Sequence, residues 1–592
     1  MDALERGIEA IREGNRDLGC QLLADWLKGH PDHCEAHDLL GCTLAAMLRT
    51  REAITAFRAG VSADADYAPL RYNLGTLLLT MGQFENAVVE LRAAVQRDPT
   101  KAAAWSNLCA AQRALGHLSE AEVAGRRATR LNPGFVEGWI NLGNTLKDRL
   151  QLDQALAAYA KAAALDFEST TSASNALLTQ CYLQSKPSAL AAAHREFGSK
   201  LANRVSERPL LEHANNERIR IGYVSGDFRL HSIMYFFGAL LNAHDRSRFD
   251  IYLYSDVESP DAETARIARA TAQWSDVRGL TDEELWAKIR ADNIDVLVDL
   301  AGHTGKRLAV YARRAAPTQV TWLGYPFSTG LATMDYRITD AIADPPDADE
   351  WYTEHLIRLE GPFLCYLPPA GSPAVAPAPV QRNGYVTFGS FNHLAKLGDD
   401  AVVLYSAILE ACEGAKLLLK CKSLSDSNTA RALVDKFMQY GISPQRLILK
   451  GHVADPVAHL AAYADVDIAL DPSPYNGTTT TFEALWMGVP VLTLSGHWHA
   501  SRVGASVMSH LGLSTLVASN PDALLVLARE LSSQHETLVE LRQVLRQLLL
   551  KSPLCDRVGF ARNFENALLA AMQERSLQTR TAAPAEAALP VV

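Results

Sequence analysis

The chain has 592 residues, 48% hydrophobic and 21% charged, so it is long enough for several globular domains of ordinary composition. Its formal net charge of −10 argues against a nucleic-acid binder, which usually carries a clustered basic face. Nine scattered cysteines without a C-x-x-C pair argue against a zinc module or a dithiol redox site and indicate reduced thiols. No signal peptide and no bilayer-length apolar run is found, so we expect a cytoplasmic protein without a membrane span.

The first third of the chain repeats with a period of 34 residues. Two columns of the repeat are leucine and alanine: Leu40, Leu74, Leu108 and Leu142, and Ala53, Ala87, Ala121 and Ala155. A unit of this length, with small residues where two helices cross, is typical of tetratricopeptide repeats. The pattern predicts a repeat superhelix over 1–168, with four full units over 33–168 after a less regular capping pair. Trp105 and Trp139 share another phase of the unit, where we expect them to fill the space between helices.

One column of the repeat is polar. Asn73, Asn107 and Asn141 stand 34 residues apart, each directly before a leucine of the repeat. A row of amides along one face of a superhelix can hold the backbone of an extended peptide without reading its sequence. The alternative is a hydrogen bond between helices inside each repeat. The pattern leaves both interpretations open.

After the repeats, the sequence predicts a helical adaptor over 169–217 and then two α/β lobes. Short β-branched strands alternate with helices, as in open parallel sheets with crossover helices. The first lobe, 218–367, and the second, 385–576, are joined by a Pro- and Ala-rich linker, 368–384, that we expect not to pack. Predicted strands cover 219–224, 249–254, 294–300 and 318–323 in the first lobe, and 385–390, 415–420, 446–450, 466–470 and 489–494 in the second. The Ala/Pro-rich end, 577–592, is predicted to be disordered.

Lobes of this kind bind ligands at the carboxyl ends of their strands, and polar residues stand at two such places. His231 closely follows the first strand of the first lobe, where it can act as a base or a phosphate donor, although a lone histidine is more often structural. Lys396 follows the first strand of the second lobe, four residues after Asn392. A lysine beside a helix N-terminus suits a pyrophosphate, and a solvated surface lysine is the alternative.

The most specific motif runs from Asp471 to Trp486. A Gly-containing turn leads from a strand end into a helix that begins with four consecutive threonines. The free N–H groups and the dipole of the first helical turn favour a diphosphate. Glu483, one turn into the helix, can accept hydrogen bonds from two ribose hydroxyls. A capping box with Thr479 or Thr480 as the cap is the structural alternative, and both interpretations can hold together.

The acidic residues of the lobes do not predict a metal site. Asp465 and Asp467 lead into an apolar strand, and Asp344, Asp347 and Asp349 lie in a Pro-containing loop. A hard cation needs convergent carboxylates, which this pattern does not provide. We therefore expect neither a metal ion nor another cofactor.

Several longer motifs resemble the O-GlcNAc transferase/SPINDLY family, and the resemblance covers nearly the whole chain. They include Trp322-Leu-Gly-Tyr-Pro, Met334-Asp-Tyr-Arg-Ile-Thr-Asp and the run 476–483. Leu300-Ala-Gly-His-Thr and Leu419-Lys-Cys-Lys look closer to the SPINDLY branch. The resemblance implies a GT-B pair of Rossmann-like lobes and metal-independent, inverting transfer of a sugar from a nucleotide sugar. The acceptor would be a Ser or Thr hydroxyl of a protein bound by the repeats.

The resemblance also implies roles for particular residues. His231 matches the family's active-site histidine, Lys396 matches the lysine that stabilises the leaving diphosphate, and His303 is a second candidate base. The residues implied in nucleotide-sugar binding are Asn392, His459, Asn476, Gly477, Thr478, Thr479, Thr480 and Glu483, with His459 packing near the base. Asn73, Asn107 and Asn141 match the family's asparagine ladder for acceptor peptides.

Three departures from the typical O-GlcNAc transferase leave the donor open. Thr478 stands where that enzyme has His, Glu483 where it has Asp, and Pro456 where it has a Lys near the base. UDP-GlcNAc is the first choice; GDP-fucose, or a nonulosonic-acid donor that modifies flagellin, are the alternatives. The resemblance also leaves a homodimer open. A repeat scaffold with an inactive transferase body is the rival function, and the retained Lys396, His231 and Glu483 argue against it.

Overall fold

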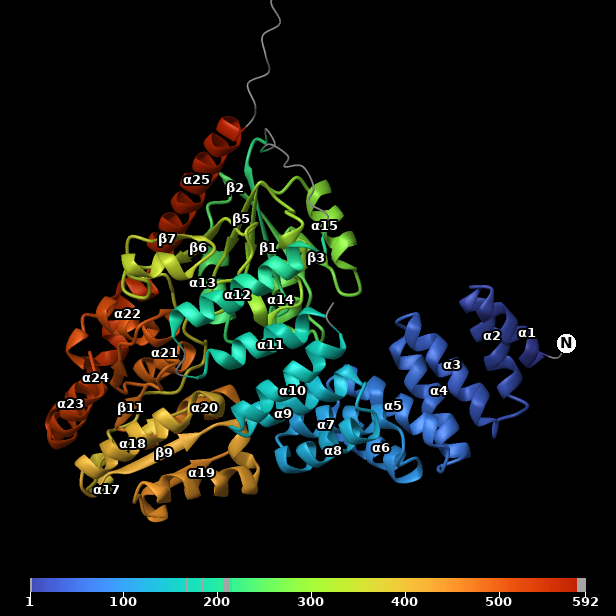
Figure 1. Cartoon of the computed structure of the whole chain (residues 1–592), viewed down its shortest axis with the longest axis horizontal. Coiled ribbons are helices and arrows are strands. Elements are labelled where there is room, and N and C mark those ends of the chain that lie inside the picture. Colours follow the sequence, from blue (N-terminus) through green and yellow to red (C-terminus); the bar gives the residue numbers. More distant parts are fainter. Residues whose placement is uncertain (1–2, 167–168, 184–185, 206–212, 214–215, 583–592) are drawn as a thin grey trace, which may run out of the picture. The chain divides into compact units, whose positions relative to one another are not determined.

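The computed structural model describes residues 3–166, 169–183, 186–205, 213 and 216–582. It forms two compact units (Figure 1), Met1–Ser172 with Ser425–Thr429, and Ala173–Leu424 with Ala430–Val592. Among the described residues, no helix combines the length and the apolar character that crossing a bilayer requires.

The first unit is an array of helix pairs, as the period of 34 predicts (Figure 1). The helices are α1 (Ala3–Arg12), α2 (Arg16–Leu27), α3 (Cys34–Ala46), α4 (Thr50–Ala63), α5 (Ala68–Thr80), α6 (Phe84–Arg97), α7 (Ala102–Leu115), α8 (Leu118–Leu131), α9 (Val136–Asp148) and α10 (Leu152–Leu165). The small column lies where the two helices of a pair cross. A Cβ atom at Gly41 would lie 2.4 Å from the ring of Phe57, and one at Gly143 would lie 2.6 Å from the ring of Tyr159. Glycine therefore permits the close helix approach that defines the repeat.

A column of N–H donors ties each repeat to the turn that enters it. The donors are His37, Arg71, Trp105 and Trp139, whose side chains bond the carbonyl oxygens of Pro31, Ala65, Pro99 and Pro133 at 3.0, 2.8, 3.0 and 2.9 Å. These residues differ in shape and charge but share an N–H group at the same phase. The expectation that Trp105 and Trp139 only fill space is therefore incomplete, because each also satisfies a carbonyl of the turn.

Trp105→Phe should loosen this turn, because it keeps an aromatic ring and removes the donor to Pro99. We expect a loss of about 0.5–1 kcal/mol in local stability, the usual value of one such hydrogen bond. Hydrogen exchange of the backbone amides in α6 and α7 measures it. Trp105→His, which restores an N–H group as at His37, is the control and should recover part of the protection. Equal protection in the Phe variant and the wild type would contradict this role.

The first lobe is built on a seven-stranded parallel sheet in the order β3-β2-β1-β4-β5-β6-β7. Its strands are β1 (Ile219–Ser225), β2 (Phe249–Ser255), β3 (Gln273–Asp276), β4 (Val296–Asp299), β5 (Thr318–Thr321), β6 (Tyr336–Thr339) and β7 (His355–Arg358). The sequence-based strands correspond to β1, β2, β4 and β5. The prediction lacks β3, β6 and β7 because these short strands carry Gln, Asp, His or Arg rather than an apolar run.

The second lobe is built on a six-stranded parallel sheet in the order β10-β9-β8-β11-β12-β13. Its strands are β8 (Thr387–Ser390), β9 (Lys416–Lys420), β10 (Leu447–Lys450), β11 (Ile468–Leu470), β12 (Val491–Leu494) and β13 (Val517–Ala518). All five predicted strands are present, and the two-residue edge strand β13 is the addition. The carboxyl ends of β8 and β11, which are neighbours in the sheet, are followed by the two motifs that the sequence singles out.

Helices connect these strands and precede the first lobe. They are α11 (Thr170–Gln180), α12 (Pro187–Ala202), α13 (Met234–Ala243), α14 (Ala262–Ala270), α15 (Asp282–Ala291), α16 (Leu308–Ala312), α17 (Val380–Asn383), α18 (Asp399–Ala411), α19 (Ser427–Gln439), α20 (Pro456–Ala461), α21 (Thr479–Trp486), α22 (Val503–His510), α23 (Pro521–Ser533), α24 (His535–Lys551) and α25 (Arg557–Ala582). The predicted adaptor contains α11 and α12, and its residues 184–185, 206–212 and 214–215 lie outside the described part of the chain.

The last helix, α25, returns from the second lobe to the first, where it lies beside the sheet (Figure 1). Glu565 of α25 accepts a hydrogen bond from the ring of His244 at 2.8 Å, and the other ring nitrogen of His244 bonds the hydroxyl of Tyr223 in β1 at 2.8 Å. All three side chains are buried. The helix includes residues 577–582 of the predicted disordered tail, and 583–592 lie outside the described residues.

The Pro- and Ala-rich linker packs against the second lobe, so the expectation that it does not pack is wrong. Its backbone supplies what its small side chains do not: Arg542 donates to the carbonyl of Ala376 at 2.9 Å, and Arg546 donates to the carbonyl of Pro373 at 2.9 Å. The N–H of Val380 donates to the buried carboxylate of Asp467 at 2.9 Å. Long donors from the lobe therefore satisfy the linker's polar groups.

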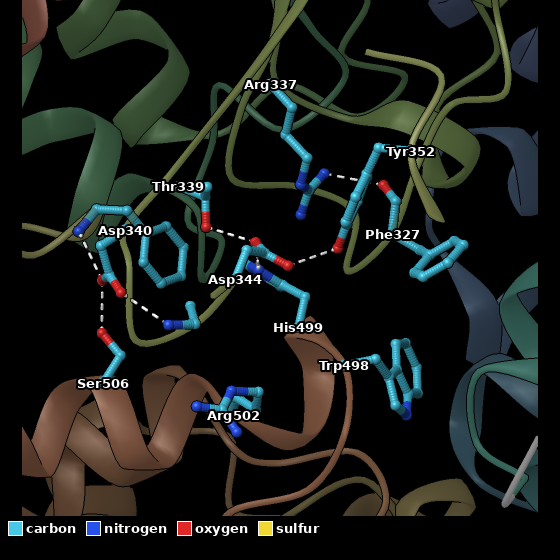
Figure 2. Close-up of polar contacts among 12 residues, drawn as sticks. Phe327, Arg337, Thr339, Asp340, Asp344, Tyr352, Trp498, His499, Arg502 and Ser506 are labelled. Carbon is cyan, nitrogen blue, oxygen red and sulfur yellow. Dashed lines mark hydrogen bonds and ion pairs between the residues drawn. The ribbon is translucent and has the colours of Figure 1, made fainter. Parts of the chain in front are cut away.

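Buried polar contacts join the two lobes within the second unit (Figure 2). His499 donates from Nδ1 to the Asp344 carboxylate at 2.6 Å, and the same carboxylate accepts from the hydroxyl of Tyr352 at 2.7 Å. Ser506 donates to Asp340 at 2.6 Å. Arg502 donates to the carbonyl of Ile342 at 2.8 Å. Charge-assisted bonds of this kind, removed from water, hold the lobes in a defined relative position.

Candidate active site

Lys396 lies where β8 gives way to a short 3-10 turn, Leu394–Lys396. Its Nζ atom donates to the backbone carbonyl of Asn476 at 2.7 Å and lies 4.1 Å from the centroid of the Tyr475 ring. Burial lowers the pKa of Lys396 to about 8, and the nearby carboxylate of Asp471 opposes this shift. An ammonium group has three donors, and within the described residues one is occupied by a protein acceptor. The others are available to a ligand.

The loop after β11 is held in shape by two buried side chains. Asp471 accepts from the N–H of Gly477 at 2.5 Å and from the hydroxyl of Thr493 at 3.0 Å. Asn476 donates from its amide to the carbonyl of Pro472 at 2.9 Å and accepts from Gly504 at 3.2 Å. Both ends of the Asn476 side chain are thus used inside the protein, so what this residue presents to Lys396 is its backbone carbonyl. Asp471 is a structural residue of the site that the sequence analysis does not assign.

The turn into α21 leaves room and donors for an anion. A Cβ atom on Gly477 would lie 2.4 Å from the hydroxyl oxygen of Thr480, so glycine keeps this turn compact. The N-cap is Thr478, without a side-chain cap bond, so the alternative of a capping box with Thr479 or Thr480 as the cap is wrong. The hydroxyl of Thr480 instead donates to the amide oxygen of Asn392 at 3.0 Å. Among the described residues, the N–H groups of Thr479 and Thr480 therefore have no side-chain acceptor, whereas that of Thr481 bonds the carbonyl of Thr478 at 3.1 Å. The first two N–H groups of α21 can thus bind a ligand.

Glu483 lies at the centre of a buried hydrogen-bond chain. Its Oε2 atom accepts from His459 at 3.1 Å and from the hydroxyl of Tyr463 at 3.3 Å. The other ring nitrogen of His459, Nδ1, lies 2.6 Å from Nζ of Lys420 at the end of β9. Since an ammonium group only donates, Nδ1 of His459 is the acceptor, and Nε2–H donates to Glu483. Burial lowers the pKa of Lys420, and Glu483 opposes this shift.

Two residues of this hydrogen-bond chain, Lys420 and Tyr463, are absent from the sequence-based assignment of the site. A signal for Lys420 is present in the sequence, because the apolar run Lys416–Lys420 ends in a lysine at the carboxyl end of a strand. Tyr463 follows the helix that carries His459 and has no comparable signal. The structure thus brings His459 and Glu483 together, as their shared assignment requires, and adds a cation behind them.

His231 lies in the loop between β1 and α13 and is half-exposed, with 39% of its side chain accessible. Its Nδ1 accepts from the N–H of Ile233 at 3.4 Å and lies 3.7 Å from the Asp227 carboxylate. Burial lowers the pKa of His231, which Asp227 opposes. Since Nδ1 faces a donor, the neutral ring carries its proton on Nε2. In the first turn of α13, which follows this loop, Phe236 packs on Phe482 of α21 with ring centroids 5.2 Å apart, so both lobes contribute to this region.

His303 does not fit the role of a base. It is 2% exposed, with Nδ1 bonded to the hydroxyl of Ser174 at 3.0 Å and Nε2 to the carbonyl of Thr329 at 3.0 Å. Phe197 covers its ring at 4.6 Å, and burial holds the pKa of His303 well below its usual range. With both nitrogens occupied inside the core, the ring cannot reach an acceptor hydroxyl. The assignment of His303 as a candidate base is corrected to a packing role.

The carboxylates considered for a metal bind protein groups. Asp465 pairs with Lys450 at 2.7 Å, and Asp467 accepts from the N–H of Thr387 at 2.9 Å. Asp344 holds His499, as described above. In the described part of the chain, no three His, Cys, Asp or Glu side chains gather as a cation would need.

A family model described as "Glycosyl transferase family 41" matches residues 196–365 and 381–564, more than half of the chain. The chain belongs to glycosyl transferase family 41. A tetratricopeptide repeat model also matches residues 44–111 of this family 41 chain, which confirms the repeat prediction. The gap between the two matched ranges, 366–380, covers most of the packed linker.

Relatives of this family 41 chain include proteins named probable UDP-N-acetylglucosamine–peptide N-acetylglucosaminyltransferase SPINDLY. The one from Solanum lycopersicum is 40% identical over 419 residues, covering 68% of this chain and 44% of the relative. The one from Arabidopsis thaliana is 39% identical over 411 residues, covering 68% and 45%. The chain thus spans less than half the length of these relatives.

Among solved structures, a mutant of the O-GlcNAc transferase from Thermobaculum terrenum matches with a TM-score of 0.81 and 33% sequence identity. The match covers 87% of this chain and 99% of the other. The likeness shows the expected architecture, tetratricopeptide repeats followed by a GT-B pair of α/β lobes. The resemblance to the O-GlcNAc transferase/SPINDLY family is therefore confirmed.

Proposed function

We propose that the chain is an inverting protein O-glycosyltransferase that moves a sugar from a nucleotide sugar to Ser or Thr hydroxyls of protein acceptors. One observation carries the proposal: a partly buried ammonium, Lys396, is anchored 2.7 Å from the carbonyl of Asn476, directly before the Gly477 turn and the first N–H groups of α21. A cation and a helix N-terminus at one place suit a diphosphate. Family membership and the names of the relatives support a transferase.

Each part of the site has a task in this reaction. As the sugar–phosphate bond breaks, negative charge grows on the departing diphosphate, and Lys396 with the first N–H groups of α21 would stabilise that charge. The acceptor hydroxyl attacks the anomeric carbon from the opposite face, which inverts its configuration. The hydroxyl proton need not leave early; if a side chain takes it, His231 is the remaining candidate. Glu483 would hold the ribose hydroxyls, with His459 beside the base.

UDP-GlcNAc is the proposed donor, supported by the names of the relatives and of the solved structure. GDP-fucose is the second candidate, favoured by Thr478 and Glu483, the two departures from the typical O-GlcNAc transferase. Thermal shift of the purified chain with UDP, GDP and CMP tests the donor, because selective stabilisation identifies the nucleotide. Stabilisation by UDP supports the first choice, by GDP the second, and by CMP a nonulosonic-acid donor. A chain that none of the three stabilises would be the inactive scaffold.

We also propose a cytoplasmic enzyme, supported by nine cysteines that are all unpaired. Flagellin is kept as a candidate acceptor and a homodimer as the candidate assembly. An acceptor panel that contains flagellin, and light scattering of the purified chain, test these two points. Absence of flagellin modification beside other modified acceptors rejects the first, and a monomeric mass rejects the second.

Transfer should need no divalent cation, because the carboxylates considered for a metal are bound to Lys450, His499 and a backbone N–H group. The charge on the leaving group is instead met by Lys396 and α21. We expect the transfer rate to be unchanged in excess chelator. A rate that chelator abolishes and Mg²⁺ or Mn²⁺ restores would contradict this expectation.

The asparagine column fits an acceptor-binding ladder that is also structural. Each amide nitrogen donates to the preceding repeat: Asn73 to Asp38 at 2.7 Å, Asn107 to Thr76 at 2.9 Å, and Asn141 to Ser106 at 2.9 Å. The alternative of a helix-to-helix bond is thus present, but between repeats rather than inside one. Within the described residues, the amide oxygens have no protein donor, and all three side chains are partly exposed. These oxygens can accept backbone N–H groups of an extended acceptor.

Replacing Asn73, Asn107 and Asn141 together by Ala should lower kcat/KM for a protein acceptor by roughly 10²-fold, since each lost bond costs on the order of 1 kcal/mol. Donor affinity should stay unchanged. The matched control is Thr76→Val with Ser106→Ala, which removes the structural partners of two of the amides and keeps the amides themselves. If the control loses as much acceptor kcat/KM as the triple variant, the column supports the fold and does not bind acceptors.

A further inference from the structure

The ammonium group of Lys396 is fixed by two neighbouring residues of one loop. Nζ donates to the carbonyl of Asn476 at 2.7 Å and lies 4.1 Å from the centroid of the Tyr475 ring. The first contact fixes Nζ along a hydrogen bond, and the second places it over an aromatic face, which attracts a cation. A lysine side chain has four rotatable bonds, so two anchors from one loop restrict where its charge can be. The proposed mechanism uses the charge and does not use the ring.

The Tyr475 ring is itself supported from a distant part of the chain. Tyr182, which follows α11 in the adaptor, stacks on Tyr475 with ring centroids 5.1 Å apart and planes at 28°. Tyr182 is 9% exposed, so this stack is shielded from water. The Tyr475 hydroxyl has no hydrogen-bond partner among the described residues. What the position uses is therefore the ring and not the hydroxyl.

We propose that Tyr475 is a positioning residue for Lys396, and that Tyr182 of the adaptor supports it. The aromatic face holds the lysine ammonium at a fixed point beside the turn into α21, where the leaving diphosphate would form. The inference rests on the proposed function, since it concerns how Lys396 is made ready for that reaction. It gives a role to the Tyr475 ring, which contacts the Lys396 ammonium. Neither the family motifs nor the position of Lys396 after a strand assigns that role.

The electrostatic surroundings give the ring a second effect. Burial disfavours the charged form of Lys396, and Asp471 is the charged group that faces it and favours that form. Asp471 is fully engaged with Gly477 and Thr493, and burial raises the pKa of Asp471 itself. An aromatic face favours the ammonium in the same direction as Asp471. Removing the ring should therefore both loosen Lys396 and make it lose its proton at lower pH.

The test compares Tyr475→Phe, which keeps the ring, with Tyr475→Leu, which removes it, in the full chain. We expect the Phe variant to keep kcat within about 2-fold of the wild type. The Leu variant should lose about 10-fold in kcat with little change in donor KM. The fall of its kcat/KM at alkaline pH should begin at a lower pH than in the wild type. Tyr182→Leu should lie between them. The matched control is Tyr385→Leu, which removes the ring whose centroid lies 4.5 Å from Nζ of Lys416 at the amino end of β9. This variant should leave kcat unchanged.

A double variant shows whether Tyr475 acts through Lys396. If it does, Tyr475→Leu should cost nothing further in a Lys396→Ala background, because the group that it positions is gone. An equal loss in both backgrounds would overturn the inference, as would a Leu variant with wild-type kcat and pH profile, or a Phe variant as impaired as Leu. Tyr475→Met, whose longer and unbranched side chain can adapt to the space of the ring, replaces the Leu variant if that one does not fold.

A readout without catalysis separates this inference from the proposed function. The rate at which a lysine-selective reagent labels Lys396, followed by mass spectrometry as pH rises, reports how readily this lysine loses its proton. Tyr475→Leu should shift that labelling curve to lower pH, and Tyr475→Phe should not. Unshifted curves reject the inference even in an active enzyme. Shifted curves in a chain without transfer activity support the positioning role and reject the proposed function.

Discussion

Lys396→Ala is expected to lower kcat by about 10²–10³-fold while changing donor affinity much less, because it removes a charge that matters most as the diphosphate departs. The anchored position of Nζ, 2.7 Å from the Asn476 carbonyl, places that charge beside the first turn of α21. Steady-state kinetics with a protein acceptor and varied donor concentration measure both quantities. The control is Lys416→Ala, a ring-stacked lysine at the amino end of β9, which should turn over normally. Near-normal turnover of the Lys396 variant would remove this lysine from the mechanism.

The same lysine predicts the alkaline side of the pH profile. Its pKa is lowered to about 8 by burial, and the reaction needs its protonated form, so kcat/KM should fall as pH rises through that value. Lys396→Arg keeps a charge that arginine does not lose in this range. We expect the Arg variant to be slower than the wild type, since its fork differs in shape, but free of the fall near pH 8. A fall that persists in the Arg variant would assign the titration to another group.

Glu483→Ala is expected to weaken binding of UDP by about 10²-fold, because a carboxylate that accepts from two ribose hydroxyls is worth a few kcal/mol. The structure prepares this carboxylate: His459 and Tyr463 both bond Oε2, which leaves Oε1 without a protein donor among the described residues. Calorimetry gives the affinity directly. The loss should be confined to the kcat/KM and Kd of nucleotides that carry both hydroxyls.

A nucleotide analogue is the control for the Glu483 prediction. 2′,3′-Dideoxy-UDP lacks the hydroxyls, so the wild type and the Glu483→Ala variant should bind it with nearly equal affinity. If the variant loses the same factor for UDP and for the analogue, Glu483 acts by orienting His459 through their 3.1 Å bond and does not hold the ribose. The same comparison with GDP and its 2′,3′-dideoxy analogue tests the second donor candidate.

The sequence predicts those features of the fold that depend on periodic patterns. A period of 34 with small residues at helix crossings locates the repeats, because each unit must bury the same face against its neighbour. Apolar β-branched runs locate the central strands of both sheets. Strand β6 is buried but is not predicted, because its Tyr-Arg-Ile-Thr sequence has no apolar run. The linker is misjudged because Ala and Pro do not show that Arg542 and Arg546, far along the chain, would bind its carbonyl oxygens.

The sequence predicts those parts of the candidate site that one continuous motif forms. It does not predict the parts that are assembled from distant segments. Lys396 and the Gly477 turn follow strand ends and are identified by that position alone. Asp471, Lys420 and the Tyr182–Tyr475 stack act through partners tens to hundreds of residues away, which no spacing rule reveals. His303 shows the opposite error, in which the sequence assigns a role that the structure does not allow. It stands in a family-like motif, but the fold buries it in the core.

The most direct measurement is the mass of intact acceptor proteins after incubation of the purified chain with UDP-GlcNAc and, in parallel, with GDP-fucose. The proposal predicts that acceptor masses increase by one or more sugar residues with one of these donors. The modification should resist chelator and be slower by about 10²–10³-fold with the Lys396→Ala variant. If the chain binds or hydrolyses a nucleotide sugar but no protein in an acceptor panel gains a sugar, or if the Lys396→Ala variant modifies acceptors as the wild type does, the proposed protein O-glycosyltransferase is contradicted.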